Sequence, residues 1–309
     1  MRVSSTAFTN ETNVRELKAR RDALEHTQQQ ISTGRRLVGP SDDPVAAADA
    51  ERARGQLARF ELEKRTMSFA KNVLGQADGA LSDATGLLQN ARDTLVAAGN
   101  GGYSSGERVL LAEQLQQTRD QLLTVANRSD GMGGFLFGGN GTRAQPFTDG
   151  TAPATPVAFR PNSGEQQVGT ELPLTTSIDG EAAFTAQRTA AGPSQNVFSV
   201  LDEAIALLRD PAASAGSVAS GVRAATDGVD AGMDALQLKR TQVGEQLRAV
   251  EQREQSVADG ELHARSHLAD LVDVDMLESL STLSTQQSAL DAAMKTYAQV
   301  SKMSLFDYL

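Results

Sequence analysis

The sequence predicts a mainly α-helical protein, an elongated antiparallel bundle of long, coiled-coil-like helices with a small β insert. Apolar residues in both outer parts of the 309-residue chain recur at spacings of three and four, as in a helix with one apolar stripe. Aromatic residues make up only 4% of the chain and Trp is absent. The core must therefore consist mainly of Leu, Ala and Val, which suit narrow seams between helices. Residues 131–193 differ, because they hold 11 of the 27 Gly and six of the nine Pro.

The N-terminal segment is predicted to form a helix with a weak apolar stripe. Leu17, Leu24 and Ile31 follow the expected spacing, but Arg21 and Gln28 occupy the positions between them. A narrow stripe diluted by polar residues buries little area, and an isolated helix gains little from intrinsic propensity. We therefore expect this helix to need a partner.

A corner should follow this helix. Gly34 and then Gly39 and Pro40 end it, because glycine tolerates the left-handed conformation after a last turn and proline cannot continue a helix. Asp43 before Pro44 predicts a new helix, since the Asp oxygen can cap free amides and proline suits the first turn. These five residues are predicted to form a joint between two helices.

The second helix is expected to keep its apolar stripe to residue 98, with Leu alternating with Ala from residue 74. This alternation permits close approach of a partner helix. Ser104, three residues before Glu107, is a candidate capping box for a third helix. The stripe of that helix contains Leu111, Leu115, Thr118, Leu122 and Val125.

The Gly- and Pro-rich segment is expected to contain about five to eight short strands, given a typical strand length of roughly five to six residues. The candidates are "FLF" at 135–137, "VAF" at 157–159 and "LPLTT" at 172–176, with turns at Asp149-Gly150 and Asp179-Gly180.

Helical periodicity then returns in three segments. The first is closed by Pro211, and the second has Arg240 and Glu254 within its apolar stripe and a predicted break at Gly260. The stripe of the last helix includes Leu280, Leu283, Leu290, Met294 and Tyr297. The predicted domains are an N-terminal assembly helix (1–40), two halves of a helical bundle (41–130 and 194–260), the β insert (131–193) and a C-terminal assembly helix (261–309).

The two terminal helices should lie antiparallel, because the chain passes out through one helical half and returns through the other. Charge favours this pairing, since residues 1–36 carry a net +3 and residues 259–309 a net −5. Arg35 and Arg36 are expected to favour the negative end of the first helix. Polar residues in the stripe weaken a hairpin formed by the two terminal helices of a single subunit. We therefore expect these helices to be poorly ordered in the free chain and to order in contact with other subunits. The predicted assembly interface is Leu17, Leu24, Ile31, Leu280, Leu283, Leu290, Met294 and Tyr297.

Several function classes are disfavoured. A net charge of −10 argues against nucleic-acid binding, and the absence of Cys excludes disulfides and thiolate metal sites. The sequence has neither an apolar run of a length that would predict membrane insertion nor a secretory signal pattern. His263 and His267 lie four apart but lack a third ligand, and the Gly-rich loops lack the phosphate-binding pattern. We therefore expect no catalytic residues, no cofactor and no metal.

Four stretches together resemble the flagellin superfamily of bacterial flagella, and within it the proteins at the junction of hook and filament. They are "MRVSST" at the start, "QQQISTGRRLVGPSDDPVAAADA" at 28–50, "GGFLFGGNGTRAQPF" at 133–147 and "QQSALDAAMKTYAQVSKMSLFDYL" at 286–309. The pattern of "ISTG", "R" and "PSDDP" is specific to the superfamily. The "GGFLFGG" stretch and the "SLFDYL" ending favour the junction proteins.

The resemblance implies a secreted structural protein, exported by the flagellar type III system without a cleavable signal peptide. It also implies assembly through the terminal helices into a ring between hook-side and filament-side subunits. The implied partners are further copies of the chain, a hook-side hook-associated protein, flagellin and an export chaperone. A flagellin that forms the filament itself and a soluble signalling coiled coil remain as alternatives.

Overall fold

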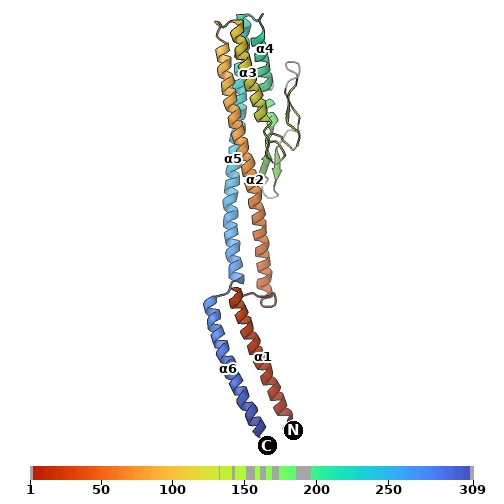
Figure 1. Ribbon diagram of the computed structural model, residues 1–309, viewed down its shortest axis with the longest axis vertical. Coiled ribbons are helices and arrows are strands. Elements are labelled where there is room, and N and C mark those ends of the chain that lie inside the picture. The colour runs from red at the N-terminus through yellow and green to blue at the C-terminus, as the bar shows by residue number, and fades with distance from the viewer. Residues whose placement is uncertain are drawn as a thin grey trace. The chain divides into compact units, whose positions relative to one another are not determined.

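The computed structural model describes residues 3–131, 133–140, 143–150, 157–160, 165–168, 174–185 and 196–306. The described residues form six α-helices (Figure 1), which are α1 (Val3–Thr33), α2 (Pro44–Ala98), α3 (Ser105–Ala126), α4 (Val197–Arg209), α5 (Ala215–Val272) and α6 (Met276–Phe306). Between α3 and α4 lie the short strands β1 (Phe147–Thr148), β2 (Ala158–Phe159), β3 (Gln166–Val168) and β4 (Leu174–Ser177), and the π-helical turn η1 (Glu181–Thr185). The predicted mainly α class with a small β insert is confirmed.

The chain divides into two compact units. One consists of Met1–Glu61 with Val257–Leu309, and the other is the continuous segment Leu62–Ser256. We call them the terminal unit and the central unit. Helices α2 and α5 contribute to both.

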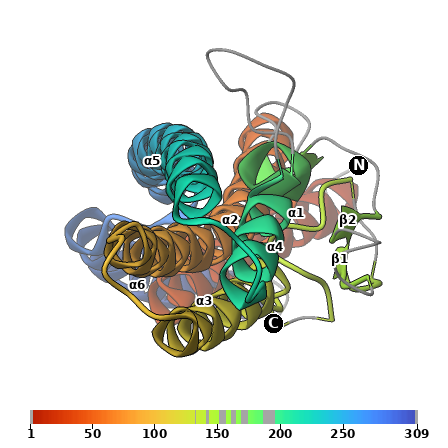
Figure 2. The same cartoon turned by 90° about the horizontal axis from the view of Figure 1, so that it is seen from above.

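The core of the central unit is the Leu/Ala stripe predicted for α2. Figure 2 looks along the bundle and shows α2 beside α3, α4 and α5. Because Ala alternates with Leu, neighbouring helices can approach closely around each Leu. The buried positions of the stripe are Met67, Ala70, Leu74, Ala77, Leu81, Ala84, Leu88, Ala91, Leu95 and Ala98, as the spacing predicted.

The charged residues predicted within the stripe of α5 form ion pairs across the seam with α2. Arg240 Nε lies 2.9 Å from Asp78 Oδ1, and Lys71 Nζ donates to Glu254 Oε2 over the same distance. These pairs allow a polar residue at a half-buried position without leaving its charge unpaired.

Local signals fix the ends of α3 and α4. Ser104 and Glu107 form the predicted capping box, in which the Glu107 carboxylate accepts from the Ser104 amide at 2.8 Å. Helix α4 ends at Arg209, two residues before Pro211, as expected. Its N-cap is Asn196, whose side chain accepts from the amide of Phe198.

The strands of the insert pair in two antiparallel hairpins. Phe147 pairs with Phe159 in β1 and β2, while β3 pairs with β4 across an irregularity in register. The strand predicted at "FLF" is wrong, since this segment is a turn with one isolated bridge between Phe135 and Ser129. Residues 172 and 173 of the predicted "LPLTT" strand lie outside the described residues.

Leu136 and Phe137 of the "FLF" segment are fully buried, and the ring of Phe137 packs against that of Phe184. The predicted Asp179-Gly180 turn instead begins η1, where Asp179 accepts from the amide of Glu181. A Cβ on Gly180 would lie 2.6 Å from the carbonyl oxygen of Phe137, so only glycine fits beneath this segment.

A cluster of phenylalanine rings connects the insert to α4. Phe184 contacts Phe137, Phe147 and Phe198 at centroid distances of 5.2, 5.4 and 6.3 Å. All four rings are buried. The insert therefore has an apolar core of its own that continues into the helical bundle.

A buried arginine completes this attachment. Arg119 of α3 bonds Asp149, which follows β1, with distances of 2.7 and 2.5 Å, and bonds Asp202 of α4 at 3.0 Å. Burial raises the pKa of Asp202, whereas the hydrogen bonds from Arg119 lower the pKa of Asp149. We call these three residues the Arg119 clamp.

The predicted break at Gly260 is wrong, because α5 continues to Val272. A Cβ at residue 260 would lie 2.9 Å from Cζ of Phe60, so the ring of Phe60 occupies the space above the helix backbone. Glycine here serves close packing, which a sequence pattern does not distinguish from a helix end.

Candidate assembly interface

Helices α1 and α6, both 31 residues long, lie side by side in the terminal unit. Their outer ends, which lead to the two chain termini, lie together in Figure 1, so the pair is antiparallel as predicted. Side chains are described from residue 11 of α1 and up to residue 299 of α6.

The eight residues predicted for the interface are incompletely covered by this pairing. Leu280 and Met294 are exposed, with 49% and 56% of their surface accessible. The other six are half-buried, namely Leu17, Leu24, Ile31, Leu283, Leu290 and Tyr297. None of the apolar side chains described in α1 and α6 reaches full burial.

The polar residues of the seam differ in part from those predicted. Arg21 and Gln28 are exposed, whereas Thr27 is the buried polar side chain of α1. Threonine is accommodated because its hydroxyl donates to the carbonyl of Ala23 in the same helix at 3.0 Å. On α6, the buried Oε1 of Gln286 has no hydrogen-bond partner among the described residues. The seam thus contains an uncompensated polar group, which weakens the pair.

The predicted joint follows α1. Gly34 has φ of +68°, the left-handed conformation that favours glycine after a helix. Asp43 Oδ1 accepts from the amides of Val45 and Ala46 at 3.1 and 3.0 Å, so the predicted helix start at Pro44 is confirmed. Within the joint, Gly39 and Pro40 form a turn before this cap.

Asp42 holds that turn, a role that the sequence reasoning missed. Its Oδ2 accepts from the amides of Val38 and Gly39, both at 2.9 Å. The hydrogen bond from the Gly39 amide lowers the pKa of Asp42. A carboxylate that closes a turn to nearby amides is a known role of Asp, so the Asp pair at 42 and 43 was the available signal.

The joint is tied to the end of α5 by backbone hydrogen bonds. The amide of Arg36 donates to the carbonyl of Val272 at 2.7 Å, and the amide of Val274 donates to the carbonyl of Gly34 at 3.1 Å. The guanidinium of Arg36 donates to the carbonyl of Leu271. The Arg36 side chain thus donates to the last turn of α5, a contact that the sequence did not predict, whereas its effect on the dipole of α1 stays a prediction.

A second corner lies between α5 and α6. Asp275 Oδ1 accepts from the amides of Leu277 and Glu278 at 2.9 and 3.1 Å and thereby caps α6. The sequence reasoning missed this residue, although Asp275 precedes an apolar periodic run in the usual N-cap position.

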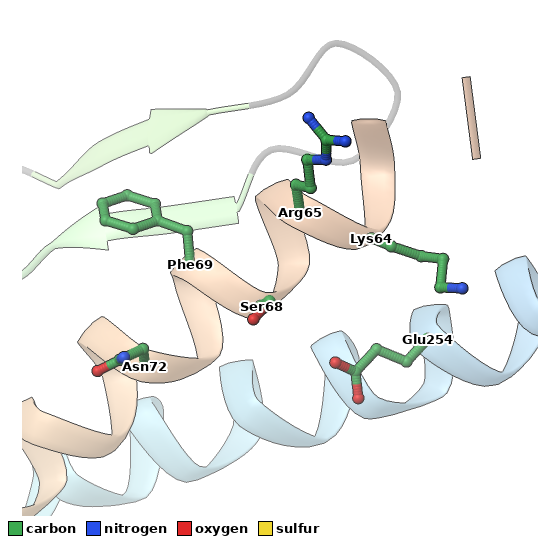
Figure 3. A pocket seen from close by; sticks show the side chains of 6 residues that line it. All are labelled: Lys64, Arg65, Ser68, Phe69, Asn72 and Glu254. Carbon is green, nitrogen blue, oxygen red and sulfur yellow. The ribbon is translucent and has the colours of Figure 1, made fainter. Parts of the chain in front are cut away.

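The central unit has a surface hollow of about 640 Å³, shown in Figure 3. Its lining comes from α2 and α5, with Phe69 directed toward a strand. Glu254, which also lines the hollow, is already paired with Lys71. The mixed charges and absence of a buried titratable group in this lining give no basis for a catalytic site.

The two histidines considered for a metal site, His263 and His267, are exposed on α5. In the part of the chain that the structure describes, no group of three or more acidic or histidine side chains is placed to hold a metal ion. Within the same residues, none of the helices combines the length and apolarity that crossing a membrane requires.

Comparison with known proteins shows which families the sequence of this chain matches. Residues 4–142 match the family described as the bacterial flagellin N-terminal helical region. The chain is 32% identical to flagellar hook-associated protein 3 of Escherichia coli (strain K12) over 292 residues, covering 90% of each protein. It is also 22% identical to flagellin of Bacillus subtilis (strain 168), covering 93% of this chain and 92% of that protein.

A solved structure shares the fold. It is the flagellar junction protein FlgL from Legionella pneumophila, with a TM-score of 0.60 and 16% sequence identity. The match covers 73% of this chain and 100% of the solved chain. At this identity the likeness concerns the arrangement of the helices.

Proposed function

Because the chain belongs to the family of flagellar hook-associated protein 3, we propose that it is a structural subunit joining hook to filament in the bacterial flagellum. The identity of 32% over nine-tenths of both proteins supports this assignment over flagellin, since flagellin of Bacillus subtilis is 22% identical over a similar share of the chain. Membership in this family also removes the signalling coiled coil from consideration.

The observation that carries the proposed mechanism is the incomplete burial of the terminal helices. Each large apolar side chain contributes about 1.5–3 kcal/mol when it passes from exposure to full burial. Six of the eight interface residues are half-buried and two are exposed, so much of this free energy is unused in the single chain. Contact with neighbouring subunits would bury the remainder and favour assembly.

The joint has a defined part in this mechanism. Gly34, Gly39, Pro40, Asp43 and Pro44 direct the chain from α1 into α2, while hydrogen bonds to Val272 and Val274 connect the same corner to α5 and α6. The last turn of α1 and the first turn of α6 therefore start from one small hydrogen-bonded framework. That arrangement presents α1 and α6 to neighbouring subunits together.

The proposed partners follow from the position of a junction subunit. They are further copies of this chain in a ring, a hook-side hook-associated protein and flagellin on the filament side, with a chaperone during export. We place the protein outside the cell, exported by the flagellar type III system. Its role is structural and without catalysis or nucleic-acid binding.

Replacing Leu290 by Glu tests the mechanism. Leu290 lies in the half-buried seam, so a charge there should block incorporation at the hook tip and release filaments into the medium. The melting temperature of the central unit should remain that of the wild type. Leu238→Glu is the matched control, because Leu238 is an exposed leucine of α5 in the central unit.

A large loss of thermal stability in purified Leu290→Glu would contradict this account, since it would mean that α6 already contributes strongly to the folded monomer. Flagellin is tested separately by adding the purified wild-type chain to filament seeds. Growth of long filaments would favour a filament subunit, whereas a junction subunit should bind without growth.

A further inference from the structure

The first turn of α6 carries the densest group of exposed large apolar side chains among the described residues. Met276, Leu277 and Leu280 expose 43%, 82% and 49% of their surface within five positions. We call these three residues the α6 knob. The carboxylate of Asp275 caps the same turn, so the knob stands on a helix end with a defined conformation.

A hollow of about 490 Å³ lies at the joint, in the same unit. Its apolar lining includes Val38, Pro40, Ala47, Ala48 and Val272. We call it the joint hollow. An apolar concavity of this size accommodates one or two large aliphatic side chains.

The charges of the two surfaces have opposite sign. Arg35, Arg54 and Glu51 line the joint hollow, and Arg54 is paired with Glu51, which leaves one net positive charge. Beside the knob, Asp275 and Glu278 are negative. Opposite charges around an apolar contact select its partner and orientation.

We propose that the α6 knob of one copy of this chain inserts into the joint hollow of a second copy. The knob does not fill the hollow of its own chain, because Leu277 remains 82% exposed there. The inference rests on the proposed self-association and names the contact that makes it.

The knob and the hollow are different surfaces, so each copy can bind one neighbour through its knob and another through its hollow. Such a head-to-tail contact repeats from copy to copy and closes into a ring when the rotation between neighbours permits. If two copies instead inserted their knobs into each other's hollows, both contacts would lie within one isologous dimer, and no knob or hollow would remain for a third copy. The contact therefore agrees with the ring proposed for the junction.

Cysteine cross-linking tests the contact, because the chain contains no native Cys. Cells would express two variants of different mass, Leu277→Cys and Ala48→Cys, and their isolated flagella would be oxidised. We expect a disulfide-linked pair that contains one chain of each kind. The control replaces Leu277→Cys by Leu262→Cys, since Leu262 is also highly exposed, at 67%, but lies outside the knob.

Equal cross-linking of the Leu262→Cys control and the knob variant would overturn the inference. So would a disulfide between the knob and another flagellar protein, with none between copies of this chain. In both cases the chain is still detected in isolated flagella, so the proposed function stands. Absence of the wild-type chain from isolated flagella would instead overturn the proposed function.

The amount of each variant incorporated at the hook tip measures how much the knob contributes to assembly. Leu277→Ser should weaken incorporation at the hook tip by roughly ten- to a hundredfold, the loss expected for one large buried side chain. Leu262→Ser should leave incorporation at the wild-type level. Unchanged incorporation of Leu277→Ser would contradict the knob contact.

Discussion

The apolar stripe of α2 in the central unit and the seam of α1 with α6 in the terminal unit follow the same spacing but reach different burial. Leu74, Leu81, Leu88 and Leu95 each expose 1% of their surface or less. In the terminal pair, Leu24 and Leu290 remain half-buried at equivalent positions of their stripes. Spacing therefore identifies which face of a helix is apolar without indicating how completely that face is covered.

The number of neighbouring helices explains the difference. Around the C-terminal part of α2, the helices α3, α4 and α5 cover its stripe from several sides (Figure 2). In the terminal unit α1 lies beside α6, and two helices bury only the line between them. A terminal pair with further subunits around it would resemble the central bundle.

The largest expected effect compares equal truncations in the two regions. Leu88→Ala removes a fully buried side chain and should cost about 2–5 kcal/mol of unfolding free energy. Leu290→Ala should cost about 1 kcal/mol or less in the monomer, because its side chain is half-exposed and the site can collapse. Urea unfolding followed by circular dichroism measures both. Equal losses would show that the terminal seam is a formed core without neighbours.

Local signals made much of the helical framework predictable. The stripe of α2, the capping box at Ser104 and the helix start at Pro44 depend on residues within one or two turns of each other, and all three were predicted correctly. The apolar faces of α1 and α6 were also evident from spacing. Their role in assembly stays a prediction, since it concerns contacts with other subunits.

The errors occurred where distant residues decide the local structure. The sequence predicts a helix end at Gly260, but the ring of Phe60 packs over this residue. The predicted "FLF" strand is a turn whose Phe137 ring belongs to the phenylalanine cluster. The Arg119 clamp joins residues 83 positions apart, so no pattern along the chain indicates it. The insert shows most clearly that packing can override local propensity.

A second prediction concerns the pH dependence of the central unit. Hydrogen bonds from Arg119 hold the pKa of Asp149 below its ordinary value of 3.8. A depressed pKa means that this carboxylate stabilises the fold above that pH and loses its contribution as pH falls through the folded-state value. Asp149→Asn should therefore lose less stability than the wild type on acidification below pH 3.8. Thermal unfolding across this range measures the difference.

Asp202 acts in the opposite direction, because burial raises its pKa and its protonation relieves a cost of folding. The acid unfolding experiment must therefore replace Asp149 and leave Asp202 unchanged, because the two carboxylates shift stability in opposite directions. Asp83→Asn is the matched control, since Asp83 forms an exposed ion pair with Arg128 and should leave the acid limb unchanged. Identical acid limbs for wild type and Asp149→Asn would contradict the stabilising role of the clamp. The terminal unit lacks the Arg119 clamp, so its hydrogen exchange should respond to neither variant.

The smallest expected effects separate two glycines of the terminal unit by sign. Gly34→Ala places a Cβ at φ of +68°, which costs about 1–2 kcal/mol, whereas Gly55 lies exposed within α2, where alanine should gain about 0.5–1 kcal/mol. Neither position has an atom within 4 Å of the added Cβ, so backbone conformation alone distinguishes them. Hydrogen exchange of the Arg36 and Val274 amides reports the joint directly, because both donate across it. Faster exchange in Gly34→Ala with unchanged or slower exchange in Gly55→Ala would establish that the joint is set by the conformation of Gly34. Equal exchange in the two variants would instead mean that the hydrogen bonds between Arg36 and the end of α5 hold the corner whatever its backbone strain.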